Sequence, residues 1–206
     1  MARDDDIALS VPPFGGGEGA GPAHEDELRA DWRVILAATA TIAAVSALCL
    51  PWPLAALSTL LGALMVAGAD VDARSYILPD LVTLGALAGG LLAAAVMEPF
   101  SPWLAVAAAV ARAAVTAGVL AAVGSVHRRL SGIEGLGLGD VKLAAAIGAW
   151  LPAEAIPFCF ALATAAALAF VLLSRLRGHA IARTTRIPFG AFLCPALWLA
   201  FFASLL

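Results

Sequence analysis

Long apolar runs, separated by short polar connections, occupy the chain from residue 34 to its end. A helix that crosses a hydrocarbon core of about 30 Å needs roughly 17 to 25 residues, so runs near this length predict transmembrane helices. The runs are Val34–Leu50, Leu54–Ala69, Leu81–Met97, Trp103–Val126, Val141–Trp150 with a short extension, Ile156–Ser174 and Pro188–Leu206. The pattern predicts an all-α fold, a polytopic membrane helix bundle of about seven transmembrane helices.

The composition agrees with a chain that lies in a lipid bilayer. Hydrophobic residues make up 62% and charged residues 13% of the 206 residues, which is more apolar surface than a soluble fold of this size buries. Residues 1–31 differ, because they are acidic, Gly-rich and without hydrophobic periodicity. We expect a disordered cytoplasmic tail at 1–31, followed by a transmembrane domain at 32–206. The tail has no basic start followed by an apolar core, so it is not a signal peptide.

The positive charges predict the orientation of the chain, because Lys and Arg accumulate in connections that stay in the cytoplasm. Except for Arg112, they lie before the first run, in every second connection after it or, for Lys142, just beyond such a connection, and the intervening connections contain none. These residues are Arg3, Arg29, Arg33, Arg74, Arg128, Arg129, Lys142, Arg175, Arg177, Arg183 and Arg186. We therefore expect a cytoplasmic N-terminus, seven crossings and a C-terminus on the opposite face.

Two connections on the predicted cytoplasmic side are polar where they border the membrane, Ala67–Asp80 and Ser131–Leu143. Asp72 lies in the first and Asp140 in the second. The third and fourth helices form a hairpin that returns the chain to the same face, so the two aspartates can meet. An Asp at membrane depth costs about 2.5 to 3.5 kcal/mol and is therefore a candidate functional residue.

Each aspartate also has a structural interpretation. Asp70 and Asp72 lie at the C-terminal end of the second helix, where the macrodipole disfavours a carboxylate, although a solvated loop start would explain them. Asp80 follows Pro79, an arrangement common at helix starts. Asp140 opens an apolar run, as an N-cap residue does.

The glycines before Asp140 favour a functional interpretation. Gly135, Gly137 and Gly139 alternate with other residues, and glycine allows close backbone approach and unusual torsions. Such a loop suits the delivery of a carboxylate into a crowded helix interface. Lys142 points to the opposite side of a helix from Asp140, so we interpret it as a snorkelling or substrate-facing charge.

Two carboxylates that converge in a partly desolvated pocket do not both ionise readily, so one proton is shared. Aspartic proteases use this arrangement. The ionised member takes a proton from a water that attacks the scissile carbonyl, and the protonated member donates to the oxyanion or the leaving nitrogen. No Walker or GxGxxG pattern occurs, and we expect no metal, no cofactor and no nucleic-acid partner. Cys49, Cys159 and Cys194 are interpreted as small buried hydrophobic residues.

Three short segments resemble motifs of the type IV prepilin peptidase family: DARSYILPD at 72–80, GLGDVKL at 137–143 and IPFGAF at 187–192. In that family the first catalytic Asp lies seven residues before a Pro-Asp or Pro-Asn, and the second closes a GxGD motif. The resemblance covers roughly Val34 to the C-terminus. It implies that Asp72 and Asp140 are catalytic and that a supporting motif is formed by Pro79, Asp80, Gly137, Gly139 and Lys142.

The resemblance also implies an activity and a location. The expected protein is an aspartic endopeptidase of the bacterial plasma (inner) membrane with its active site facing the cytoplasm. Its substrate would be a prepilin or pseudopilin with a short basic leader, and Asp70, Asp80 and Glu134 are candidates to attract that leader. Long members of the family carry an N-terminal N-methyltransferase domain with paired cysteines. This sequence has neither the paired cysteines nor the length of those members, so the resemblance implies a short, peptidase-only member.

Two other functional classes stay open at this point. A small proton- or cation-coupled transporter would also use intramembrane aspartates, although such sites tend to lie near the midplane. A structural subunit of a secretion machine would leave Asp72 and Asp140 unexplained. Arg112 lies well inside the fourth predicted span with no acid on an obvious facing turn, so it either snorkels or faces the bundle interior.

Overall fold

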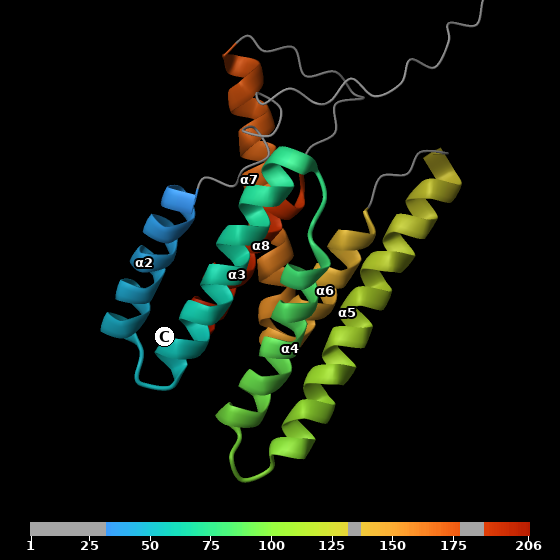
Figure 1. Ribbon diagram of the computed structural model, residues 1–206. Helices are drawn as coiled ribbons and strands as arrows, with labels where there is room; N and C mark the ends of the chain where they lie inside the picture. The colour runs from blue at the N-terminus through green and yellow to red at the C-terminus, as the bar shows by residue number, and fades with distance from the viewer. Residues whose placement is uncertain (1–31, 132–136, 178–187) are drawn as a thin grey trace, which may run out of the picture.

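The computed structural model describes residues 32–131, 137–177 and 188–206, and the regular structure in these ranges is helical throughout. The helices are α2 (Trp32–Cys49), α3 (Leu54–Ser75), α4 (Asp80–Met97), α5 (Pro102–Ser131), α6 (Leu138–Trp150), α7 (Ala155–Leu176) and α8 (Gly190–Ser204). Successive helices run in opposite directions in one bundle (Figure 1). The predicted polytopic helix bundle is confirmed, whereas the predicted tail at 1–31 lies outside the described residues.

The helices fall into two length classes. Five of them, α2, α3, α4, α5 and α7, are long and apolar enough to cross a membrane. Helices α6 and α8 have 13 and 15 residues, which at 1.5 Å per residue is about 20 and 22 Å, shorter than the ~30 Å hydrocarbon core. The fifth and seventh apolar runs therefore form helices too short to span the core by themselves.

The two short helices form the centre of the bundle. Helix α6 contacts α4, α5 and α8, and α8 also contacts α3 and α7. Leu143 and Ile147 of α6 and Leu193 and Leu197 of α8 are fully buried. The longer helices surround this core and expose apolar side chains outward, where a bilayer is the solvent that suits them.

Close backbone contact and one hydrogen bond hold α6 in place. A Cβ on Gly148 would lie 2.5 Å from the carbonyl oxygen of Arg112, so only glycine lets α5 approach this closely. On the other side, Trp150 Nε1 donates to the carbonyl oxygen of Ala86 in α4 at 2.7 Å. The Trp150 ring also meets Phe201 of α8 edge to face. Helix α6 is thus clamped at its C-terminal end, which determines where its N-terminal end lies.

Helix α3 continues to Ser75, beyond its predicted end at Ala69. Asp70 and Asp72 therefore lie inside a helix, and the interpretation of these residues as a solvated loop start is wrong. Tyr76 caps the C-terminal end of the helix, and its left-handed φ of 56° is a common conformation for such a cap. Pro79 then disfavours helical torsions in the residue before it, so the chain stays extended until α4 begins.

The charges of the described residues divide between the two ends of the bundle. Except for Arg112, the Lys and Arg residues lie at one end, which also carries Asp72 and Asp140 (Figure 1). They are Arg33, Arg74, Arg128, Arg129, Lys142, Arg175 and Arg177. The opposite end carries Glu98 and Glu154 and, within the described ranges, no cation. The folded arrangement keeps the one-sided charge distribution on which the predicted orientation depends.

The cysteines depart from the prediction at one position. Cys159 and Cys194 are buried, but Cys49 is exposed. Cys49 is the last residue of α2, a helix that packs mainly on α3. A peripheral helix end offers no interior in which to bury it.

Candidate active site

Asp72 lies in the last two turns of α3 and is nearly buried, with 5% of its surface exposed. Its carboxylate faces the first residues of α8. The N–H of Ala191 donates to Asp72 Oδ2 at 2.7 Å, and the N–H of Gly190 donates to the same carboxylate. The first N–H groups of a helix have no intrahelical partner and carry the positive end of its dipole. Helix α8 therefore stabilises the negative charge of Asp72, which the dipole at the C-terminal end of α3 disfavours.

Asp140 is the third residue of α6, and the N-cap is Gly137. The interpretation of Asp140 as an N-cap is therefore wrong by three positions. The N–H of Gly137 instead donates to the Asp140 carboxylate, as the acid at the third position of a capping box accepts from the N-cap backbone. This contact orients Asp140 at the start of the helix.

Leu78 brings the two aspartates together. It is 7% exposed and lies in the connection between α3 and α4. A Cβ on Gly139 would lie 3.1 Å from the Leu78 Cβ, and a Cβ on Gly190 would overlap the Leu78 side chain and the Asp72 carboxylate. The starts of α6 and α8 thus approach the same loop through glycines. Asp72 and Asp140 lie close enough for their charges to repel each other.

The neighbouring charged residues form ion pairs. Asp70 Oδ1 accepts from Arg74 one turn later at 2.8 Å, and Asp80 Oδ1 accepts from Lys142 at 2.5 Å. The interpretation of Lys142 as a snorkelling or substrate-facing charge missed this pair, because Asp80 is 62 positions away in sequence. Asp70 and Asp80 are thus already paired with cations, which weakens the hypothesis that they attract a basic leader. Glu134, the third candidate for that role, lies outside the described residues.

Pro79 is the N-cap of α4, and Asp80 is the first helical residue. The Pro79 carbonyl oxygen accepts from Val82 and Thr83 at 3.1 and 3.2 Å. Pro79 therefore ends the extended connection, and α4 starts at Asp80, one position before the predicted run that begins at Leu81. With Leu78 before it, this connection forms one wall of the site.

Sequence reasoning missed one contributor to the site. The backbone N–H groups of Gly190 and Ala191 donate to Asp72, although the IPFGAF segment that contains them stands out only through its family resemblance.

For Arg112 the structure decides between the two interpretations that the sequence leaves open. Its Nε donates to the carbonyl oxygens of Gly148 and Leu151 at 3.2 and 3.0 Å, so it faces the bundle interior and binds the C-terminal end of α6, where carbonyls lack intrahelical partners.

Comparison with known proteins identifies related sequences. The prepilin leader peptidase/N-methyltransferase of Dickeya chrysanthemi is 40% identical over 139 residues, covering 65% of this chain and 47% of the relative. The protein of the same name from Aeromonas hydrophila is 36% identical over 168 residues, covering 81% of this chain and 55% of the relative. The chain thus spans about half the length of these relatives.

A family model also matches this chain. No solved structure matches this chain. The model of the type IV leader peptidase family matches residues 59–172, which include both aspartates and the loop around Leu78. This match covers more than half of the chain, and the chain belongs to the type IV leader peptidase family.

Proposed function

We propose that the chain is a membrane-embedded aspartic endopeptidase that removes the leader peptide from type IV prepilins or pseudopilins, with Asp72 and Asp140 as its catalytic pair. One observation carries the proposal: α3 and α6 bring two carboxylates from distant parts of the sequence to one place, beside the N-terminus of α8. The printed names of the relatives support the substrate class.

The hydrogen bonds suggest a division of labour between the two carboxylates. Asp72 accepts two backbone N–H groups at the start of α8, whereas Asp140 accepts one, from Gly137, and each such bond favours the ionised carboxylate. Asp72 is therefore assigned as the base that takes a proton from the attacking water. Asp140 is assigned as the acid that donates to the oxyanion or the leaving nitrogen. The reaction needs only a water besides the peptide.

The charge distribution supports a cytoplasmic reaction. The end of the bundle with the aspartates also carries the described cations other than Arg112, and such ends stay in the cytoplasm. A prepilin presents an apolar helix to the bilayer and its leader to the cytoplasm. The scissile bond would then lie at the level of this site in a bacterial plasma membrane.

The test is cleavage of a co-expressed prepilin in membranes, followed by gel mobility. Asp72→Asn and Asp140→Asn should each lower the cleavage rate by about 10²-fold or more, since each removes an acid–base group worth about 10² to 10⁴. Asp70→Asn is the matched control, because Asp70 lies two residues before Asp72 on the same helix and its i,i+4 ion pair with Arg74 is worth about 0.3 to 0.5 kcal/mol. Cleavage that persists in the Asp72→Asn or the Asp140→Asn variant would exclude this pair as the catalytic residues and would favour the proton- or cation-coupled transporter.

A further inference from the structure

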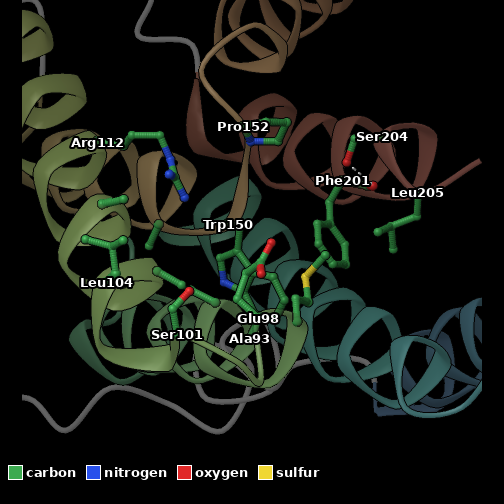
Figure 2. Close-up of a pocket in the computed structure, with 15 residues that line it drawn as sticks. Ala93, Glu98, Ser101, Leu104, Arg112, Trp150, Pro152, Phe201, Ser204 and Leu205 are labelled. Atoms are coloured by element: carbon green, nitrogen blue, oxygen red, sulfur yellow. Dashed lines mark hydrogen bonds between the residues drawn. The ribbon is translucent and has the colours of Figure 1, made fainter.

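A hollow lies at the C-terminal ends of α6 and α8, away from the aspartates. Its volume is about 550 Å³, and it is formed by the end of α4, the first turns of α5, the end of α6 and the last turn of α8. The short length of α6 explains it: the helix ends at Trp150 and the chain turns at Leu151, while α5 continues past this level to Pro102. Figure 2 shows the side chains around this hollow.

Arg112 contributes a positive charge to the hollow. Its Nε is engaged by the carbonyls of α6, but among the described residues neither terminal guanidinium nitrogen has a hydrogen-bond or acid partner. Arginine stays charged in proteins, and an unpaired cation inside a membrane is costly. The planar fork of the remaining N–H groups suits a phosphate, which it can bind in a bidentate manner.

Glu98 contributes a negative charge to the same hollow from the end of α4. Its side chain is exposed, and the described part of the chain shows no ion pair between it and Arg112. In Figure 2 the two side chains approach the hollow from different helices. The remaining walls are largely apolar, with Met97, Leu104 and Leu205 among them.

We propose that this hollow binds the headgroup of a zwitterionic membrane phospholipid, a phosphoethanolamine. Arg112 binds its phosphate, Glu98 binds its ammonium group, and the apolar walls contact the acyl chains. The position agrees with this occupant, since the hollow opens at the helix ends that border the membrane surface, where headgroups lie. Opposite charges on two walls complement a zwitterion better than they complement a purely anionic headgroup.

The purified full chain in mild detergent is titrated with phosphatidylethanolamine or phosphatidylglycerol of the same acyl composition, and bound lipid is measured by native mass spectrometry. We expect phosphatidylethanolamine to bind about threefold more tightly, the ratio expected for one partly exposed ion pair. Glu98→Gln should remove this preference. Arg112→Gln should weaken both lipids, with thermal unfolding measured alongside because Arg112 also holds α6.

Glu154→Gln is the matched control. Glu154 is an exposed acid at the same end of the bundle but does not line the hollow, so its variant should retain the wild-type preference. Equal affinity of the wild type for the two lipids, or equal behaviour of the Glu98 and Glu154 variants, would overturn the proposal. Displacement of the lipid by equimolar inorganic phosphate would also overturn it, because the hollow would then be a simple anion site.

Discussion

Asp72 has an environment that its own helix does not provide. At the end of α3 the macrodipole opposes a negative charge, yet the N–H groups of Gly190 and Ala191 at the start of α8 donate to its carboxylate. Gly190 makes this possible, because a Cβ there would lie 2.8 Å from Asp72 Oδ2 and overlap Leu78. The position of the carboxylate therefore depends on the absence of a side chain at residue 190.

Gly190→Ala should lower prepilin cleavage by about tenfold to a hundredfold, because displacing a catalytic group by about 1 Å costs up to 10²-fold. The rate is measured in membranes at matched protein levels. Gly118→Ala is the control, since a Cβ there meets nothing within 4 Å. Full activity of the Gly190 variant would show that the Asp72 carboxylate does not need this contact.

Helix α6 is positioned at both ends by contacts with other helices. At its C-terminal end Arg112 of α5 binds its carbonyls, and Trp150 donates to α4. At its N-terminal end Lys142 pairs with Asp80 of α4. Because α6 is too short to span the bilayer alone, these contacts determine its depth and so the depth of Asp140.

Gly148→Ala should destabilise this arrangement, because its Cβ would lie 2.5 to 2.7 Å from backbone atoms of Arg112 and Ala113. Overpacking of this kind costs about 1 to 3 kcal/mol. Thermal unfolding in detergent should therefore show a lower midpoint. Gly85→Ala is the control, since the nearest atom to its Cβ would be 3.8 Å away; equal midpoints for the two variants would contradict close packing of α5 on α6.

At the scale of the whole molecule, the bundle separates two chemically different ends. The aspartates and most described cations lie at one end, and Glu98, Glu154 and the hollow lie at the other. The positive-inside rule predicts that the first end faces the cytoplasm. The proposed cleavage and the proposed lipid site would then act at opposite membrane faces.

Cysteine labelling tests this orientation. In a Cys49→Ser background, which removes the exposed native thiol, Glu154→Cys should react with a membrane-impermeant maleimide added outside intact spheroplasts. Asp80→Cys, also at an exposed position, should react only after the membrane is opened. The reverse pattern would place the aspartates on the outer face and contradict the proposed cytoplasmic reaction.

The sequence alone determined the helical class, the approximate positions of the helices and the one-sided charge, and it singled out the two aspartates that we propose as catalytic. These features are local, because apolar run length, the charge of a connection and short motifs such as that around Asp140 do not depend on distant residues. The helix boundaries were predicted less accurately: α3 continues past Ala69, because its last turns are polar and yet Asp72 within them accepts a hydrogen bond from Ala191 of α8.

Only the tertiary structure decided which groups surround each charge. The Ala191 N–H that donates to Asp72 lies 119 positions away in sequence, and Lys142 lies 62 positions from Asp80. Arg112 meets the end of α6 only because Gly148 lets the two helices touch. The central position of the short helices α6 and α8 is also decided by tertiary packing. The surrounding helices shield α6 and α8 from lipid, so these two helices need not span the bilayer. No local sequence pattern indicates which helices surround them.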